Sequence, residues 1–372
     1  MKLLILLTLF GLTAAAVFQH QLIRVKSRKT RMMEKGTWET YKKSKSASQP
    51  MTDFDDIEYV ANVTIGTPPQ SFLVQLDTGS SDFWIPDNSC TDNKVCRHKF
   101  DSNASSTYVL KGQKWSITYG DNGYARGIVG EDTVRFENGD DDVLVVPKSA
   151  VGQANQISSD FGQFPTDGIL GLAFPSINEE KSDPVLFNAY KQGLLDKPIF
   201  TIYLEERGHV ENVNAGAITY GGLDTEHCSS DIDYVDLTSE DWYQFKVDSV
   251  SLGTAKSSDG WQVISDTGTT LIVVPPEIFD LLAKAAGANA NGSIDCNASF
   301  DDLKLTISGK EYTIPAKQLI LDEGNGQCLF GIDGMDMGDY GPQWILGDAW
   351  MRSYCNVFNF QDKNIGFAKI NK

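Results

Sequence analysis

Two aspartates in matching short segments are the residues best suited to chemistry. The segment Asp77-Thr78-Gly79-Ser80-Ser81 recurs 189 residues later as Asp266-Thr267-Gly268-Thr269-Thr270. In each copy an aspartate follows an apolar run and precedes a glycine and hydroxyl residues. This arrangement places a carboxyl group at the end of a buried strand. A single copy is more often a turn whose aspartate caps its own backbone. The repeat therefore carries the chemical hypothesis, and neither copy carries it alone.

Two such carboxyl groups, brought together, can activate a water molecule. When they are buried side by side they cannot both ionise, so the pKa of one falls and that of the other rises. The ionised group can then take a proton from an attacking water while the protonated group donates to a peptide carbonyl, without a covalent enzyme intermediate. We therefore expect Asp77 and Asp266 to act as one shared-proton pair.

A second repeated motif indicates two related lobes. Apolar runs precede both aspartates, at 72–76 and 261–265, and each aspartate is followed at similar spacing by Ile-Leu-Gly, at 169–171 and 345–347. Repeats in the same order predict two homologous lobes. We expect them to cover residues 51–220 and 221–372, with the boundary between about 205 and 235.

The elements that must position these residues are mainly strands. Short alternating or β-branched runs are separated by Gly, Pro, Asn and Asp, and two proline-led apolar runs, at 184–195 and 276–286, predict helices. The expected strands include 59–65, 72–76, 115–119, 143–146, 200–204, 245–252 and 304–307. The sequence therefore predicts a mostly-β protein.

The start of the chain predicts export and a pro-segment. Lys2 precedes an apolar run that ends at Ala14-Ala15-Ala16, which is typical of a signal peptide over residues 1–16. Residues 17–50 hold nine Lys or Arg and two acids, although the whole chain has a net charge of −18. A basic tract can also contact nucleic acid or membrane. Beside a signal peptide it favours a pro-segment that folds over the acidic body and inhibits it, so neither partner is expected.

Cysteines and glycan acceptor sites agree with export. An even count of six cysteines suits an oxidising compartment. Four Asn-X-Ser/Thr motifs are candidate glycosylation sites, at Asn62, Asn103, Asn291 and Asn297. The acidic composition favours work at acidic pH, with solubility as the alternative explanation. Metal-ligand spacing, a phosphate-binding motif and serine or cysteine nucleophile signatures are absent, so no metal or cofactor is expected.

At these motifs the chain resembles the pepsin family of aspartic endopeptidases, from about residue 57 to the C-terminus. The residues that carry the resemblance are Ile65-Gly66-Thr67-Pro68-Pro69-Gln70, both Asp-Thr-Gly motifs, Asp167-Gly168-Ile169-Leu170-Gly171-Leu172 and Trp344-Ile345-Leu346-Gly347-Asp348. Segments 262–265 and 353–357 are also similar to nematode digestive and cathepsin D-like enzymes. The resemblance implies a two-lobed fold with pseudo-two-fold symmetry, an active-site cleft, polypeptide substrates, pepstatin-type inhibitors and a monomeric, secreted zymogen, extracellular or in a gut lumen. A lysosomal protease and an inactive peptide-binding protein remain open alternatives.

The resemblance also assigns supporting roles. Residues that flank the aspartates would hold them, with the hydroxyl groups of Ser80 and Thr269 bonded to the outer carboxylate oxygens; they are Thr78, Gly79, Ser80, Thr267, Gly268 and Thr269. Residues 115–124, which read independently as a hairpin around Asp121-Asn122-Gly123, would form the flap over substrate. The expected substrate-contacting and flap residues are Tyr119, Gly120, Asp121, Thr270 and Trp84, the last packed on Tyr119.

The chain departs from pepsin at three places. The flap is one residue longer, which puts the substrate contacts of Gly120 and Asp121 in doubt. Asp82 replaces an uncharged Asn; we expect it to be exposed and nearly neutral in effect, although it could raise the pKa values of the aspartate pair. By family position, Cys90 pairs with Cys96 and Cys296 with Cys328, which leaves a proposed Cys228–Cys355 bridge.

Overall fold

The computed structural model describes residues 16–26, 57–120, 123–136, 143–206, 213–324, 326–338 and 341–371. The expected signal peptide up to residue 15, residues 27–50 of the expected pro-segment and the flap residue Asp121 lie outside the described residues.

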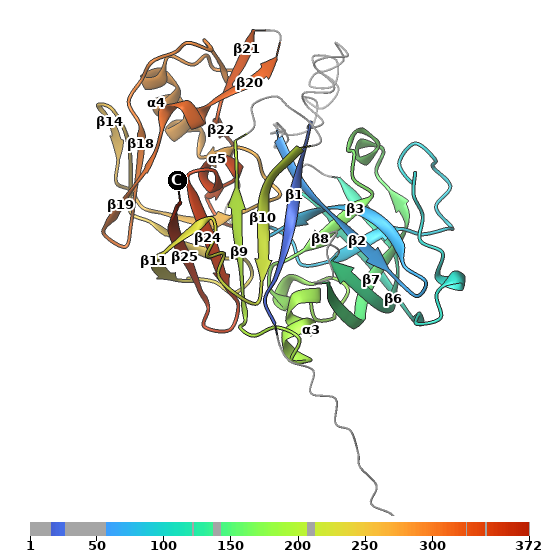
Figure 1. The fold of residues 1–372 in the computed structure, drawn as a ribbon. Helices are drawn as coiled ribbons and strands as arrows, with labels where there is room; N and C mark the ends of the chain where they lie inside the picture. Colours follow the sequence, from blue (N-terminus) through green and yellow to red (C-terminus); the bar gives the residue numbers. More distant parts are fainter. Residues whose placement is uncertain are drawn as a thin grey trace, which may run out of the picture.

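One large sheet runs through both halves of the chain. It has thirteen strands, and β1, β9 and β10 lie between the blue-to-green first half and the orange-to-red second half (Figure 1). Its order is β11 (Cys228–Asp236), β25 (Asn364–Ile370), β24 (Tyr354–Asn359), β9 (Ile199–Leu204), β10 (Val213–Tyr220), β1 (Phe18–Lys26), β2 (Ile57–Ile65), β3 (Gln70–Asp77), β8 (Gly168–Gly171), β4 (Phe83–Pro86), β7 (Leu144–Ile157), β6 (Tyr124–Phe136) and β5 (Val109–Thr118).

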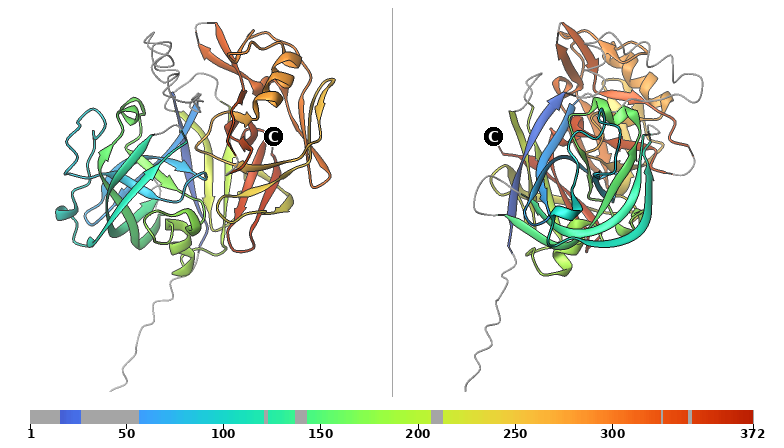
Figure 2. Two further views of the ribbon diagram at one scale, coloured as in Figure 1. Left: turned by 180° about the vertical axis from the view of Figure 1, so that it is seen from behind. Right: turned by 90° about the vertical axis from the view of Figure 1, so that its right-hand side faces the viewer.

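The second half adds three smaller sheets. Their strands, sheet by sheet, are β12 (Gln244–Val247), β15 (Trp261–Ser265), β23 (Trp344–Leu346), β16 (Ile272–Val274) and β22 (Ile332–Gly334); β14 (Ala255–Ser257), β13 (Ser249–Leu252), β18 (Leu303–Ile307) and β19 (Lys310–Ile314); and β17 (Ser293–Ile294), β21 (Gln327–Phe330) and β20 (Ile320–Gly324). Seen from behind, the blue-to-green half and the orange-to-red half lie on opposite sides of the molecule (Figure 2, left). The predicted mostly-β, two-lobed fold is confirmed.

Helices are short and few in the described residues. They are α3 (Val185–Lys191), α4 (Pro276–Ala286), α5 (Asp348–Met351) and the 3-10 turns η1 (Ser102–Ala104), η2 (Ser159–Gln163), η3 (Pro175–Ile177) and η4 (Ala316–Leu319). None of them is long and apolar enough to cross a membrane. The expected helix 184–195 ends early because Gly193, at φ +71°, turns the chain in the left-handed region.

Two sequence expectations about strands need adjustment. The run 245–252 forms two strands, β12 and β13, which belong to different sheets. Residues 18–26, the first part of the expected pro-segment, form β1 in the middle of the large sheet, paired with β10 and β2. Its buried residues include His20, Leu22 and Arg24. This part of the basic leader is therefore a sheet strand and does not lie across the cleft.

The repeated motifs build the same local arrangement twice. In the first half β3 pairs in parallel with β8, so that Asp77 lies beside Gly171. In the second half β15 pairs in parallel with β23, so that Ser265 lies beside Leu346. Each Ile-Leu-Gly segment thus supports the strand that ends at an aspartate.

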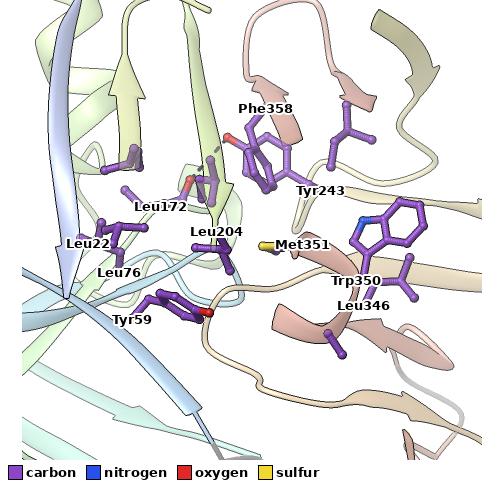
Figure 3. Packing of buried hydrophobic residues seen from close by; sticks show 14 of the residues in the cluster. Leu22, Tyr59, Leu76, Leu172, Leu204, Tyr243, Leu346, Trp350, Met351 and Phe358 are labelled. Atoms are coloured by element: carbon purple, nitrogen blue, oxygen red, sulfur yellow. Dashed lines mark hydrogen bonds between the residues drawn. The ribbon is translucent and has the colours of Figure 1, made fainter. Parts of the chain in front are cut away.

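A continuous apolar core fixes the two halves relative to each other. Figure 3 shows Leu22 and Leu76 on one side of the close-up and Trp350 on the other, with Leu204 and Met351 between them. These side chains are at most 2% exposed. Close packing of this kind transmits position accurately, which is what two groups on different lobes require.

Three disulfides are formed, and all cysteines are bonded. They are Cys90–Cys96, Cys228–Cys355 and Cys296–Cys328. These are the pairs expected from the sequence. The second joins the start of β11 to β24, across 127 residues of chain.

Candidate active site

The two aspartates of the repeat meet between the lobes. Asp77 is the last residue of β3 and Asp266 directly follows β15; their exposed fractions are 6% and 7%. A Cβ atom on Gly79 would lie 2.6 Å from Oδ1 of Asp266, and one on Gly268 would lie 2.5 Å from Oδ1 of Asp77. Each glycine therefore gives the opposite carboxyl group room to approach.

Each carboxyl group is held by its own loop in the same way. The Gly79 N–H donates to Oδ1 of Asp77 at 2.8 Å, and the Ser80 hydroxyl donates to Oδ2. In the second lobe the Gly268 N–H donates to Oδ1 of Asp266 at 2.8 Å. The Thr269 hydroxyl donates to its Oδ2 at 2.6 Å. Both carboxyl groups are thereby fixed in orientation.

The loops are also tied to each other through their threonines. The N–H of Thr78 donates to Oγ1 of Thr267, and the N–H of Thr267 donates to Oγ1 of Thr78, both at 3.0 Å. The Thr78 hydroxyl donates to the Ser265 carbonyl at 2.9 Å, and the Thr267 hydroxyl to the Leu76 carbonyl at 2.7 Å. This crossed arrangement sets the distance between the lobes at the aspartate pair.

The hairpin expected to form the flap is present. Strands β5 and β6 pair up to Thr118 and Tyr124, and the Tyr119 N–H donates to the Gly123 carbonyl at 2.8 Å. The Trp84 indole N–H donates to the Tyr119 hydroxyl at 2.6 Å. Trp84 and Tyr119 therefore lie together, as expected.

Comparison with known proteins agrees with this geometry. A family model described as eukaryotic aspartyl protease matches residues 58–370. The chain belongs to this family. It is 44% identical to aspartic protease 6 of Caenorhabditis elegans over 385 residues, covering 99% of each chain. It is 37% identical to aspartic protease 2 of Necator americanus and 33% identical to pepsin II-1 of Oryctolagus cuniculus, with 99% of each chain covered in both cases. The chain is thus an aspartic-type endopeptidase.

The cleft of this aspartyl protease opens on the aspartate pair. A cavity of about 320 Å³ is bounded by both aspartates and both motif glycines, and by Tyr119 and Gly120 of the hairpin expected to form the flap. The rest of its wall is largely apolar and includes Phe161, Phe164, Ile169, Trp242, Ile264, Met335, Met337 and Ile345. Thr270, expected to contact substrate, is 2% exposed and is not among the residues that line this cavity.

Electrostatics favour one shared proton in the aspartate pair. Burial raises the pKa of both carboxyl groups, and the charge of Asp266 raises that of Asp77 further. A hydrogen bond between the two raises the pKa of Asp77 and lowers that of Asp266. Two carboxyl groups with raised pKa values at this distance cannot readily ionise together, which favours one proton shared between them.

Asp82 does not lie on the surface as expected. It is 0% exposed and accepts three N–H groups, from the Trp115 indole at 2.8 Å and from the backbone of Glu180 at 2.8 Å and Glu179 at 3.2 Å. Burial raises its pKa. The expectation was wrong because the Trp115 indole and the 179–180 backbone, both distant in sequence, supply the donors that make burial of a carboxyl group tolerable.

The sequence also missed residues of the second-lobe wall. The Trp242 indole N–H donates to the Gly79 carbonyl at 2.9 Å, so this side chain reaches the first Asp-Thr-Gly loop from the other lobe. Met335 and Met337 pack with it in a small apolar cluster. An apolar residue next to a strand is ordinary in such a chain, so no sequence pattern marked these three.

Among the described residues no cluster of His, Cys, Asp or Glu could hold a metal ion.

Proposed function

We propose that this chain is the precursor of a secreted endopeptidase that cleaves peptide bonds at acidic pH with a water activated by Asp77 and Asp266. The observation that carries the proposal is the mutual arrangement of the two Asp-Thr-Gly loops, in which each glycine makes room for the opposite carboxyl group. Such geometry is required for two carboxyl groups to share one proton.

The proposed reaction uses the two groups in different protonation states. Ionised Asp266 takes a proton from water, whose oxygen bonds to the peptide carbonyl carbon, while protonated Asp77 gives its proton to the carbonyl oxygen. The resulting gem-diol breaks its C–N bond as the nitrogen receives a proton from Asp266, and Asp77 takes back a proton from a diol hydroxyl. Both aspartates end in their starting states.

The cleft supports an extended polypeptide as substrate. Its wall around the aspartate pair is mainly apolar, with aromatic residues from the flap side and methionines from the second lobe. We infer a preference for apolar side chains next to the cleaved bond, because their burial against this wall is favourable. The proposed substrate contacts of Gly120 and Asp121 belong to the same inference.

Residues 17–50 are proposed to act as an intramolecular inhibitor that acid releases. Their first part is already integrated into the large sheet as β1, whose Gln19 amide donates to Asp224 at 3.4 Å. Acid protonates carboxyl groups of the body and so weakens their attraction for the basic leader. The four candidate glycan acceptors, Asn62, Asn103, Asn291 and Asn297, are all exposed, which suits a secreted glycoprotein. A digestive role is the favoured setting, with a lysosomal one as the alternative.

Cleavage of denatured haemoglobin at acidic pH tests the reaction. We expect pepstatin to abolish activity and Asp77→Asn or Asp266→Asn to lower kcat by about a hundredfold to ten-thousandfold, as expected for loss of acid or base catalysis. Asp280→Asn, on the exposed face of α4, is the matched control and keeps activity. Activity that survives pepstatin or either aspartate substitution contradicts the mechanism.

Incubation of the purified precursor in acid tests the inhibitor role. The chain should shorten itself and gain activity, and the Asp77→Asn precursor should stay intact. If the wild-type precursor stays intact in acid while an added protease activates it, self-release is wrong.

A further inference from the structure

Behind the flap, two buried carboxyl groups lie together where catalysis does not require them. Asp82 is 0% exposed and Glu180 is 3% exposed. The Glu180 backbone N–H donates to Oδ1 of Asp82 at 2.8 Å, so the two residues are in direct contact. Buried acids need strong compensation, which makes such a pair costly unless it positions something.

A chain of contacts leads from this pair to the flap. Oδ1 of Asp82 also accepts the Trp115 indole N–H, at 2.8 Å. The ring of Trp115 lies 6.3 Å from that of Trp84, centroid to centroid. The Trp84 indole N–H in turn donates to the Tyr119 hydroxyl at 2.6 Å. Three contacts thus connect Asp82 to Tyr119, by way of Trp115 and Trp84.

The same site shows specific shaping around Gly152 of β7. A Cβ atom there would lie 2.9 Å from Oε1 of Glu180 and 3.1 Å from both Cε2 of Trp115 and Cβ of Trp84. Three of the participating side chains therefore converge on the space that this glycine leaves free. The site is built around the carboxyl group and does not merely tolerate it.

We propose that Asp82 and Glu180 are positioning residues that hold Tyr119 over the cleft through Trp115 and Trp84. Asp82 fixes the Trp115 indole, and Trp115 then supports Trp84, whose N–H aims the Tyr119 hydroxyl. This inference rests on the proposed flap role of Tyr119. It adds a set of contacts that begins at Asp82, five residues after Asp77, and reaches the flap without passing through the aspartate pair.

The protonation states follow from the surroundings. Burial raises the pKa of Asp82, while its three N–H donors act in the other direction and favour the ionised carboxylate. Burial, and next the charge of Asp82, raise the pKa of Glu180 well above its usual range, although the Gly152 N–H, Ser182 and Asn178 act in the other direction. The support is therefore free of charge repulsion where Glu180 is neutral, and is strained when Glu180 ionises beside an ionised Asp82.

Four of the five other charged groups that border the cavity beside Glu180 are paired with an opposite charge; Lys148 is the fifth. Glu180 borders a polar cavity of about 270 Å³ through which it can exchange protons with solvent. The charged residues on that cavity are Lys111, Glu131, Lys148, Lys181 and Asp183. Lys111 pairs with Glu131 at 2.9 Å, Lys181 with Glu179 at 3.5 Å and Lys191 with Asp183 at 2.6 Å.

Steady-state kinetics of the activated enzyme on a peptide substrate test the proposal. Asp82→Asn places an amide against a backbone N–H, and Trp115→Phe removes the indole donor. Trp115→Phe should raise KM and lower kcat/KM by about tenfold at the acidic optimum, since the hydrogen bond from the indole to Asp82 is lost. Asp82→Asn keeps Oδ1 as the acceptor for the indole and loses the bond from the Glu179 N–H, so its effect should have the same direction and be smaller. Glu179→Gln is the matched control: its side chain is 51% exposed and only its backbone contacts Asp82, so its kinetics should equal wild type.

Glu180→Gln provides the pH readout. It should match wild type at the acidic optimum, where Glu180 is already neutral. Because glutamine cannot ionise, the pH at which KM begins to rise should move upward in this variant and stay in place in Glu179→Gln. If Glu180 had only a structural role, Glu180→Gln would lower the midpoint of thermal unfolding without changing the pH at which KM begins to rise.

Two results overturn the proposal. One is wild-type KM and kcat/KM in folded Trp115→Phe, which leaves both carboxyl groups intact and so remains informative if Asp82→Asn fails to fold. The other is an unmoved alkaline limb in Glu180→Gln. Tyr119→Phe separates this failure from failure of the flap role: if Tyr119→Phe also behaves as wild type, the proposed flap role is wrong, and if it alone raises KM, only the support by Asp82 and Glu180 is wrong.

Discussion

Thr78 and Thr267 exchange hydrogen bonds across the lobe boundary, with the N–H of each 3.0 Å from the hydroxyl oxygen of the other. Both residues are buried, at 0% and 6% exposure. Each hydroxyl also donates to a carbonyl of the opposite strand. The position of each aspartate is thereby set by the other lobe.

Thr78→Val should destabilise the protein and impair catalysis. It leaves the Thr267 N–H and the Ser265 carbonyl without partners, at about 1–3 kcal/mol for each buried group. Urea unfolding should show this loss, and kcat should fall because the aspartate pair loosens. Thr78→Ser keeps the hydroxyl and should stay close to wild type; equal losses in the serine and valine variants would mean that packing, and not hydrogen bonding, matters.

Gly79→Ala should cost far more activity than stability. The added methyl group would lie 2.6 Å from Oδ1 of Asp266 and must push that carboxyl group away from Asp77. A misplacement of about 1 Å can cost on the order of a hundredfold in kcat. Gly112→Ala is the control, since open space surrounds it and only its φ of +72° adds strain, about 1–2 kcal/mol. Comparable kcat values for the two variants would contradict the close approach.

Thr269→Val should move the acid limb of the kcat profile to higher pH. The Thr269 hydroxyl lowers the pKa of Asp266 by donating to Oδ2 at 2.6 Å. Without it the carboxylate ionises at higher pH, so the base form is lost sooner as pH falls. The shift should be about 1–2 pH units, because a hydrogen bond to a charged group is worth about 1.5–3 kcal/mol and one unit is 1.36 kcal/mol. Thr269→Ser should keep the wild-type limb, and an unmoved limb in the valine variant refutes the assignment of Asp266 as the base.

Local and repeated signals explain what the sequence predicted. The Asp-Thr-Gly repeat and the two Ile-Leu-Gly motifs lie next to the strands they belong to, so spacing alone indicated the aspartate pair and two lobes. The flap hairpin was marked by its Asp121-Asn122-Gly123 turn. Each of these features depends on residues close together in the chain.

Features that depend on distant partners were not predictable in this way. Burial of Asp82 requires the Trp115 indole and the backbone N–H groups of residues 179 and 180, which the fold brings to it. The place of β1 was hidden because a basic leader reads as a solvated segment, although its buried residues alternate in part. The contact of Trp242 with Gly79 crosses the lobes and leaves no local pattern.

Protonation of His20 in acid should weaken the binding of β1 to the rest of the sheet. Its ring packs against Phe136 and Tyr220, with centroids 6.4 Å away in both cases. Within the described part of the chain its Nδ1 has no hydrogen-bond partner. Burial lowers the pKa of His20 from 6.5 to about 4. The seated strand thus holds the neutral imidazole, whereas a released strand would protonate near 6.5.

The sign of the pH effect follows from these two values. Above about pH 6.5, His20 does not change the free energy that keeps β1 in the sheet. As pH falls toward 4 this free energy decreases, and below that it is smaller by about 3 kcal/mol, since each pKa unit corresponds to 1.36 kcal/mol. His20→Leu removes the titrating group, so acid conversion of the precursor should need a lower pH or proceed more slowly. Gel analysis of the full chain between pH 3 and 6 measures this. If His20→Leu converts with the wild-type pH midpoint, protonation of His20 does not contribute to release of β1.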